Sequence, residues 1–512
     1  MLVDTFRFKI DERTGLRVGR PPVAVRMLGP DNAMLRAEIK FRPDEFGGIF
    51  TCKTHEVIDA AFRLQVDTGR AGVLILQTCL LPPREEPYDL AVELARHQIA
   101  VFMNKSEDWE MFDPSRAPEA VETFEHARHI FTDSLITQDP QEQGAMAFAA
   151  LDQGLRATDR LAHAHADILL HRKFRSRGAS STTFGTTVSL HHAPQAQENL
   201  LKGFDVLSMP IRWVDIETTQ GTYDFSRLDE WMKWAKTQKR PIVAGPLVSV
   251  TAEDLPPWVS EQRAHYSVFR DLTYDFMEAV VSRYIQFVGI WKVVSGIHIN
   301  GDVRFKSSEM IDLTRTANLL VRQYRRGART MIEVDDLFGD LAAKSSGSLN
   351  AFEYLEKVRS EGLRCDCFGA RLIVGGQSPS QRSRDLMTVS HVLDRFVTLD
   401  KPVLISAFGA PGSTQEPAAG RWGANWDAQR QASWVSRFVP VALSKPYIES
   451  VIWDSHQDVP ARQGFGLVDS SGAPRLAHEK LLSMRRRLRQ PLGPWEGQRA
   501  THEDSGDRNT TE

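Results

Sequence analysis

The pattern of hydrophobic and polar positions changes along the chain, and its first part predicts β-structure. Residues 1–117 contain short segments that mix apolar and polar residues between Gly, Pro and Asp, such as MLRAEIKF, AAFRLQVD and GVLILQTCLL. Short runs bounded by turn-forming residues are typical of β-strands. We therefore predict a β-rich, sandwich-like accessory module over residues 1–117, with carbohydrate binding as a candidate role. The periodicity of residues 88–113 fits either a strand or a helix.

The next segment has a different period. Between residues 118 and 177, Ala, Leu and other apolar residues recur at intervals of three and four. This spacing predicts amphipathic helices, which Asp139-Pro140 separates. The sequence RSRGASS at 175–181 is typical of a linker. At the other end of the chain, the polar residues 491–512 predict a disordered tail.

Residues 178–490 alternate between apolar strand-like segments and helical patterns. The strand candidates are residues 182–190, 205–213, 240–249, 289–297, 329–336, 365–374, 401–408 and 449–454. Eight strand–helix units in roughly 300 residues predict an α/β fold of the (β/α)₈ TIM-barrel type. The alternative is a doubly wound open sheet, but no Gly-rich phosphate-binding turn follows the first strand.

Composition and charge narrow the classes of partner. The 512 residues are 42% hydrophobic and 25% charged, as in ordinary globular proteins, and the net charge is −3. Without a basic excess, we expect neither nucleic acid nor a membrane surface as a partner. The start of the chain, MLVDTFRFKIDERTG, has no apolar segment behind a basic patch, so we predict no signal peptide and a cytoplasmic location.

No motif indicates a cofactor or a metal. The chain has no H-E-x-x-H, Walker, dinucleotide-binding or G-x-S-x-G pattern. Cys365 and Cys367 form a C-x-C pair, but no two further ligands are evident near them, and we interpret both as core residues. We therefore expect no cofactor and no metal site.

A resemblance to a known family begins in the second and third predicted strands. The sequence resembles glycoside hydrolase family 10, whose members are retaining endo-β-1,4-xylanases with barrel folds. The matching residues are Arg212-Trp213, Ile216-Glu217, Gly221-Thr222-Tyr223-Asp224-Phe225, Asp229, Gly245-Pro246-Leu247 and Leu255-Pro256-Pro257-Trp258. The similarity extends over residues 182 to about 485. It implies a barrel that acts on or binds an oligo- or polysaccharide.

The same resemblance implies that two catalytic carboxylates have been replaced. Trp291-Lys-Val-Val-Ser-Gly resembles the family's W-D-V-V-N-E segment, and Val403-Leu-Ile-Ser-Ala resembles the strand that ends in I-T-E. The acid position is then Gly296 and the nucleophile position is Ala407. Retaining hydrolysis needs two carboxyl groups about 5–5.5 Å apart. We therefore predict that the standard mechanism is lost.

Three hypotheses remain open. The first is binding of a β-linked oligo- or polysaccharide without turnover. The second is an active glycoside hydrolase with relocated carboxylates. Glu333, Asp335 and Asp336 end the fifth predicted strand, Asp454 ends the eighth and Asp458 follows it, and of these Asp335, Asp336 and Asp454 are the candidates. Their alternative roles are helix caps or ion pairs with Arg. The third is a noncatalytic assembly protein that uses its N-terminal region as an interface and forms an oligomer.

Aromatic and polar residues near the predicted strand ends are candidates for sugar contacts. Aromatic rings stack on sugar rings, and polar edges bind hydroxyl groups. Trp422 and Trp426 lie in the segment RWGANWD after the seventh strand, although packing in the core is the alternative for tryptophans. The substrate-binding candidates are Arg212, Trp213, His298, Arg371, Trp422, Trp426 and Trp453. Within the resemblance, Arg212 replaces a Lys and Arg371 replaces a Gln.

Overall fold

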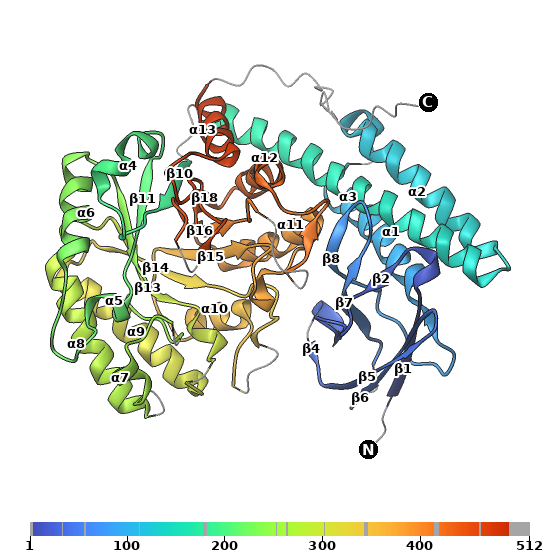
Figure 1. Ribbon diagram of the computed structural model, residues 1–512, viewed down its shortest axis with the longest axis horizontal. Helices are drawn as coiled ribbons and strands as arrows, with labels where there is room; N and C mark the ends of the chain where they lie inside the picture. The colour runs from blue at the N-terminus through green and yellow to red at the C-terminus, as the bar shows by residue number, and fades with distance from the viewer. Residues whose placement is uncertain are drawn as a thin grey trace.

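The eight strand candidates form a closed parallel barrel in the computed structural model (Figure 1). The structure describes residues 4–490 except 33, 56–57, 112, 178–181, 252, 263–264, 302, 343–346, 414–418 and 460–461. The predicted tail at 491–512 and part of the predicted linker lie outside the described residues.

The barrel strands follow one another in chain order around the ring, and every neighbouring pair is parallel. The ring closes where β10 pairs with β18. The strands are β10 (Thr183–Thr187), β11 (Val206–Pro210), β12 (Ile242–Gly245), β13 (Ile290–Ser295), β14 (Arg329–Val334), β15 (Cys367–Ile373), β16 (Val403–Gly409) and β18 (Ile448–Trp453). The (β/α)₈ prediction is confirmed, and closure excludes the open-sheet alternative.

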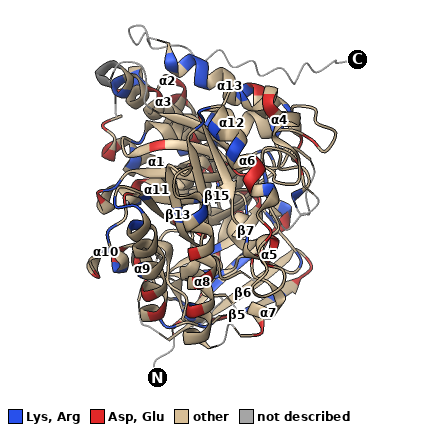
Figure 2. Cartoon of the chain, turned by 90° about the vertical axis from the view of Figure 1, so that its left-hand side faces the viewer, with Lys and Arg blue, Asp and Glu red and all other residues tan. Residues whose placement is uncertain are grey.

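Helices surround this ring with their apolar faces inward. In α9 the buried residues Met310, Thr314, Ala317 and Val321 recur at intervals of three and four, which places them on one face. The other helices of this half are α4 (Pro194–Leu201), α5 (Trp213–Ile216), α6 (Ser226–Thr237), α7 (Pro257–Ser260), α8 (Tyr266–Tyr284), α10 (Ala351–Ser360), α11 (Leu386–Asp394), α12 (Ala428–Ser444) and α13 (Leu476–Arg489), and α9 spans Ser307–Tyr324. Basic and acidic residues are interspersed over the outer helices (Figure 2).

The N-terminal half contains two antiparallel-rich sheets that pack face to face. One has the order β5-β6-β1-β9, and the other has the order β17-β8-β7-β3-β4 with β2 paired to β7, where the edge strand β17 (Arg421–Trp422) comes from the barrel part of the chain. Phe8 and Phe62, from opposite sheets, stack with ring centroids 4.3 Å apart. The strands are β1 (Asp4–Asp11), β2 (Arg17–Val18), β3 (Arg26–Leu28), β4 (Met34–Leu35), β5 (Ala37–Asp44), β6 (Gly47–Thr54), β7 (Ala61–Asp67), β8 (Gly72–Gln77) and β9 (Tyr88–Asp89). The predicted β-rich module is thus present.

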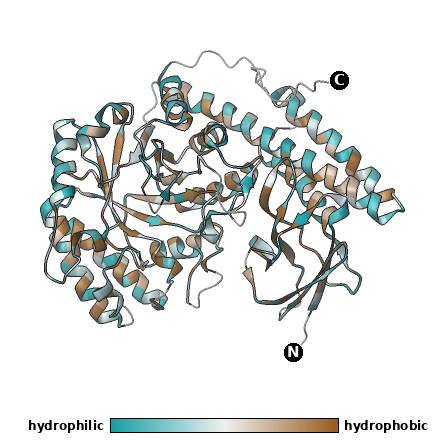
Figure 3. Cartoon of the chain, in the orientation of Figure 1, coloured by the Kyte–Doolittle hydropathy of each residue, from teal (hydrophilic) through white to brown (hydrophobic). Residues whose placement is uncertain are grey.

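Three helices follow the sheets and lead to the barrel. They are α1 (Leu90–Asp108), α2 (Pro118–Ile136) and α3 (Pro140–Arg177). Residues 88–113, whose periodicity fitted either a strand or a helix, are mostly helical and form α1. Hydrophobic and hydrophilic residues alternate in bands along α2 and α3 (Figure 3). Leu151 of α3 packs in the N-terminal core and Phe174 in the barrel core, so this long helix connects the two.

A loop of the barrel also completes the N-terminal sheet. Strand β17 (Arg421–Trp422), which lies after β16, pairs antiparallel with β8. Arg421 also donates to Asp67 of β7 at 3.0 Å. A second junction forms around the carboxylate of Asp340, which is buried between Arg63 of β7 at 2.8 Å and Arg384 of the barrel. The N-terminal sheets are therefore joined to the barrel by backbone pairing and by buried ion pairs.

Candidate functional site

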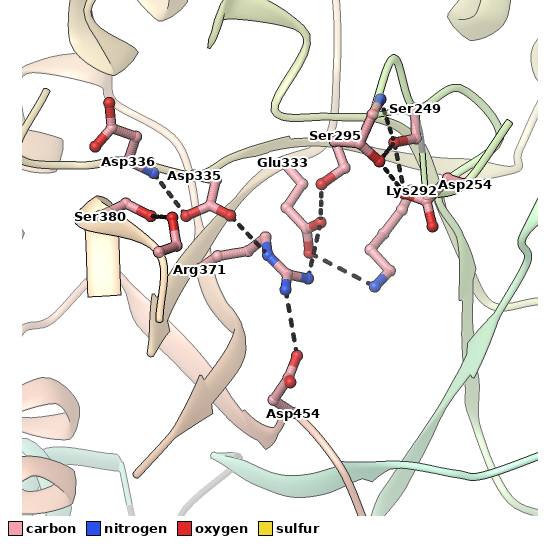
Figure 4. A network of polar contacts seen from close by, with 12 residues as sticks. Ser249, Asp254, Lys292, Ser295, Glu333, Asp335, Asp336, Arg371, Ser380 and Asp454 are labelled. Atoms are coloured by element: carbon pink, nitrogen blue, oxygen red, sulfur yellow. Dashed lines mark hydrogen bonds and ion pairs between the residues drawn. The ribbon is translucent and has the colours of Figure 1, made fainter. Parts of the chain in front are cut away.

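The carboxyl-terminal mouth of the barrel contains a buried charged cluster (Figure 4). Side chains alternate along a strand, so Glu333 lies on the same inward face of β14 as Met331 of the apolar layer beneath it. Lys292 Nζ of β13 lies 3.5 Å from Glu333 Oε1, and Arg371 Nη1 of β15 lies 3.8 Å from Glu333 Oε2. Ser295 Oγ donates to the same Oε2 at 2.5 Å. An apolar layer thus supports a layer of paired charges.

Arg371 connects this inner layer to two further carboxylates. Its Nε donates to Asp335 Oδ2 at 3.2 Å, and its Nη2 donates to Asp454 Oδ1 at 3.4 Å. Arg462 also binds Asp454. The three cations Lys292, Arg371 and Arg462 therefore balance Glu333, Asp335 and Asp454. We call these six residues the mouth network.

The electrostatics of Glu333 differ from those of a catalytic acid. Burial by itself would raise its pKa, but Lys292 and Arg371 outweigh burial and hold the pKa below its usual value. The side chain is 0% exposed. A general acid must carry a proton at the working pH, which requires a raised pKa. Glu333 is therefore suited to holding charge balance and not to donating a proton.

Asp336 adjoins Asp335 in sequence but has a separate role. Its backbone is left-handed, with φ of 47°, and its side chain points away from Arg371 (Figure 4). The carboxylate accepts the backbone N–H groups of Asp340, Leu341 and Ala342 at 2.7–2.9 Å. Burial raises the pKa of Asp336 to about 7, against the effect of these N–H groups. Asp336 thus holds the loop that carries Asp340.

The two positions where the resemblance predicts catalytic carboxylates lie beside the mouth network. Gly296 follows β13 in a left-handed conformation with φ of 58°, and a β-carbon placed there would lie 3.8 Å from Asp335 Cβ. Ala407 of β16 is buried and is in register with Arg371. A side chain at either position would therefore lie next to a charged residue of the mouth network, Asp335 in one case and Arg371 in the other.

Three of the tryptophan candidates are buried and hydrogen-bonded. Trp213 Nε1 donates to Glu217 Oε2 at 2.7 Å, and Trp453 Nε1 donates to the Phe465 carbonyl at 2.9 Å. Trp426 Nε1 donates to the Gly420 carbonyl at 3.1 Å. None of the three rings is more than 5% exposed. They pack within the protein and offer no open face for a sugar in this structure.

Arg212 and His298 also have protein partners. Arg212 Nε donates to Asp254 Oδ1 at 3.1 Å, while Nη1 pairs with Asp215. His298 is fully buried, and its Nε2 lies 3.1 Å from the Asp335 carbonyl oxygen. Burial lowers the pKa of His298 to about 4, so the ring is neutral near pH 7. It supports the backbone beneath Asp335.

Trp422 lies apart from the other candidates. It belongs to β17 and is half-buried against the N-terminal sheet, with the Arg437 guanidinium 5.5 Å from its ring centroid. Its ring lines a cavity of about 590 Å³ between the N-terminal module, α3 and α12. Sequence reasoning placed Trp422 with Trp426 because only three residues separate them, but the turn between them sends the two rings to different environments.

The cavities near these residues differ greatly in size. The space beside Asp335, Asp336 and Arg371 measures about 10 Å³, enough for about one water molecule. The cavity beside Trp422 measures about 590 Å³, and another, between β8, α1 and α11, measures about 410 Å³. Ligand pockets commonly span about 300–1,000 Å³. Of these three spaces, the two larger ones lie at the junction of the N-terminal module with the barrel.

Sequence reasoning missed two members of the mouth network. Lys292 was visible as a charged residue inside an otherwise apolar strand, at a position where the resemblance has Asp. Buried charges are normally paired, so that Lys was a signal for a carboxylate on a neighbouring strand. Arg462 lies in a loop without any periodic pattern, and nothing in the sequence indicated its contact with Asp454.

Comparison with known proteins places the barrel in a family. The model of glycosyl hydrolase family 10 matches residues 171–482. The chain belongs to glycosyl hydrolase family 10. The family match covers all eight barrel strands, begins in the last turns of α3 and ends inside α13, and it leaves strands β1 to β9 outside. No curated protein matches the sequence.

Solved structures similar to the chain include members of family 10. A family 10 protein from Paenibacillus barcinonensis is 16% identical, with a TM-score of 0.45, over 62% of this chain and 97% of that one. Xylanase 10B from Thermotoga petrophila, solved with xylobiose, is 14% identical, with a TM-score of 0.46, over 63% and 98%. A thermostable mutant of Xyn10A from Cellvibrio japonicus is 13% identical, with a TM-score of 0.47, over 59% and 97%.

The described residues contain neither a cluster of metal ligands nor a helix suited to a membrane. Among them, no group of three or more His, Cys, Asp and Glu side chains has the arrangement to hold a metal ion. No helix in the same part of the chain combines the length and apolarity needed to cross a bilayer.

Proposed function

We propose that this family 10 protein binds a β-linked oligo- or polysaccharide and does not hydrolyse it by the family's retaining mechanism. The observation that carries the proposal is the shared use of Arg371 by Glu333, Asp335 and Asp454. These three acidic side chains are committed to the charge-balanced mouth network, and the carboxylate of Asp336 is occupied by three backbone N–H groups. Gly296 and Ala407, at the positions predicted for the acid and the nucleophile, supply no replacement.

The chemistry of retaining hydrolysis explains why this arrangement argues against turnover. One carboxyl group must carry a proton for the leaving oxygen, and the other must be free to attack the anomeric carbon. Asp335 and Asp454 both accept a hydrogen bond from the same guanidinium, which occupies one oxygen of each carboxylate. General acid catalysis alone commonly contributes about 10²–10⁴-fold to the rate. Its loss, together with that of the nucleophile, removes the standard mechanism.

Family membership supports a carbohydrate as the ligand. The barrel scaffold is retained over residues 171–482, and several residues of the resemblance now maintain its structure. Glu217, for example, accepts from Trp213 Nε1 and from the Gly221 N–H, both at 2.7 Å. A barrel that keeps its structure but lacks the two catalytic carboxylates supports a protein that binds a sugar and does not cleave it.

The test uses the purified full chain and two measurements. Release of reducing ends is followed with a panel of β-linked glycans that includes xylan, and binding of the same glycans is measured by calorimetry. We expect binding to at least one glycan and no release above the buffer rate. Release that disappears in Asp335→Ala or Asp454→Ala would establish the alternative, an enzyme with relocated carboxylates.

A third outcome separates recognition from assembly. If no glycan binds and the chain forms a stable oligomer whose mass is unchanged by any glycan, the proposal is wrong and a scaffolding role follows. Light scattering of the same sample, with and without glycan, gives that answer.

A further inference from the structure

The cavity beside Trp422 lies at the meeting point of three parts of the fold. The turn between β7 and β8 and helices α2 and α3 form the N-terminal side, and β17, α11 and α12 form the barrel side. Its lining residues are Arg70, Ala71, Leu74, Glu119, Glu122, Leu155, Arg156, Asp159, Arg160, Asp385, Leu386, Trp422, Gly423, Arg430 and Arg437. At about 590 Å³ it is large enough for a short oligosaccharide.

The charges around this cavity are balanced overall, so the arginines without a partner decide which guest it can bind. Five arginines and four carboxylates line the cavity, and a fifth carboxylate, Asp152, pairs with Arg156 at 3.2 Å. Asp159 is already paired with Arg437, and burial raises the pKa of Asp385, which caps α11 through the Thr388 N–H. The remaining carboxylates, Glu119 and Glu122, are exposed on α2. These acidic groups disfavour a polyanion but allow a guest with one carboxylate.

Two of the arginines remain available for such a guest. Within the described residues, the guanidinium groups of Arg70 and Arg430 make no hydrogen bond and no ion pair to the protein. Arg70 belongs to the β7–β8 turn, and Arg430 belongs to the first turn of α12. An arginine binds a carboxylate through two parallel N–H donors, which makes the pair strong and directional.

Trp422 supplies the surface that a sugar ring needs. It is half-buried, its backbone is held by pairing with Gly72, and Arg437 approaches its ring. Leu155 and Leu386 add apolar surface nearby. A fixed aromatic ring with unpaired arginines in one cavity is suited to a sugar that carries a carboxylate.

We propose that the cavity lined by Trp422, Arg70 and Arg430 binds an acidic oligosaccharide, with a uronic acid as the charged residue. This inference rests on the proposed carbohydrate-binding function. It adds the chemical class of the ligand and the location of the binding site. Trp422 stacks on a sugar ring, while Arg430 and Arg70 bind the carboxylate. The site lies outside the barrel mouth and requires both the N-terminal module and the barrel.

The experiment compares two matched probes on the full chain. One is a β-linked oligosaccharide with a single glucuronic acid residue, and the other is the same oligosaccharide with its carboxyl group reduced to the alcohol. Calorimetry measures both affinities at low and at moderate salt. We expect the acidic probe to bind at least about tenfold more tightly than the reduced probe, with a difference that shrinks as salt rises.

Two variants and two controls locate the site. Arg430→Gln should reduce the affinity for the acidic probe about tenfold and leave the reduced probe unchanged, whereas Trp422→Leu should weaken both. Arg315→Gln removes an exposed arginine of α9 that pairs with Glu361, and it should change nothing. Circular dichroism and the melting temperature verify that each variant is folded.

The outcomes distinguish this inference from the proposed function. Equal affinity for the two probes, or no effect of Arg430→Gln and Trp422→Leu, would overturn the inference. If binding is instead lost in Arg371→Gln, the sugar binds at the barrel mouth, and only the proposed function survives. Failure of both probes and of the whole glycan panel would overturn both.

Discussion

Lys292 Nζ lies 3.5 Å from Glu333 Oε1 inside the barrel, where the two side chains are 5% and 0% exposed. A buried ion pair is costly to form, because both charges lose their hydration. Once formed, it cannot lose one partner without leaving an uncompensated buried charge. The Lys292–Glu333 pair therefore ties the stability of the barrel to the balance of charge at its mouth.

Removal of the lysine charge should destabilise the protein strongly. We expect Lys292→Met to lower the free energy of unfolding by about 3–5 kcal/mol, because Glu333 would keep its charge with fewer partners. Urea unfolding measures the change. The matched control is Lys40→Met, which breaks an exposed pair with Glu38 and should leave the free energy of unfolding nearly unchanged. The double variant Lys292→Met/Glu333→Gln should recover part of the loss. Equal costs for Lys292→Met and Lys40→Met would contradict this account.

The buried His298 should make the protein sensitive to mild acid. Burial lowers its pKa to about 4 in the folded state from an ordinary value of 6.5, so between these pH values the unfolded chain binds a proton that the folded chain does not. The contribution of His298 to the free energy of unfolding is therefore fully present above pH 6.5. It decreases as the pH drops towards 4, by up to about 1.4 kcal/mol per pH unit.

The variant His298→Gln should reduce that slope by the contribution of one proton. Chemical unfolding at pH 7.0, 6.0 and 5.0 provides the comparison with the wild type. His129→Gln is the control, since His129 is exposed on α2 and should leave the slope unchanged. A wild-type slope that His298→Gln does not alter would show that this ring is not the responsible group.

Pairing between β17 and β8 should depend on the absence of a side chain at Gly72. Gly72 has φ of 111°, and a β-carbon there would lie 2.3 Å from the Arg421 carbonyl oxygen. We expect Gly72→Ala to separate β17 from β8 and to accelerate hydrogen exchange in both strands, while the amides of β13 and β14 keep their protection. The control Gly327→Ala places a methyl group where no atom lies within 4 Å. Unchanged exchange in β17 after Gly72→Ala would refute the pairing.

Asp340 should be required for the junction between the N-terminal module and the barrel. Its carboxylate is buried between Arg63 and Arg384, so Asp340→Asn would leave two buried guanidinium groups without their counter-ion. We expect a loss of several kcal/mol in the free energy of unfolding, of the order measured for broken buried pairs. Limited proteolysis should cut earlier near this junction. Asp271→Asn, at an exposed pair with Arg270, is the control and should leave the cleavage pattern intact.

The barrel strands were predictable because their signal is local. The strands are four to seven residues long and most are rich in apolar residues, and their number and order sufficed for the prediction of a closed ring. The segment that became α1 remained ambiguous, since the burial of Leu94, Ile99 and Phe102 against the N-terminal sheets, and not the period alone, selects the helix.

The candidate site was predictable only in part. Asp335 and Asp454 were chosen because they lie at the ends of the fifth and eighth predicted strands, and they do meet at the mouth, through Arg371. Trp426 and Trp453 are apolar and aromatic whether they face a ligand or the core, so the sequence did not separate these roles. Their burial and hydrogen bonds decide between them.

The sequence by itself determined the number and order of the barrel strands, the N-terminal β-structure and the resemblance to family 10, because periodicity and motif spacing are properties of neighbouring residues. Only the tertiary structure decided that Lys292, Glu333, Arg371 and Asp454 form one balanced network, and that Trp422 lies at the junction with the N-terminal module. Those contacts join residues far apart in the chain. Their energies depend on distance and burial, which exist only once the chain has folded.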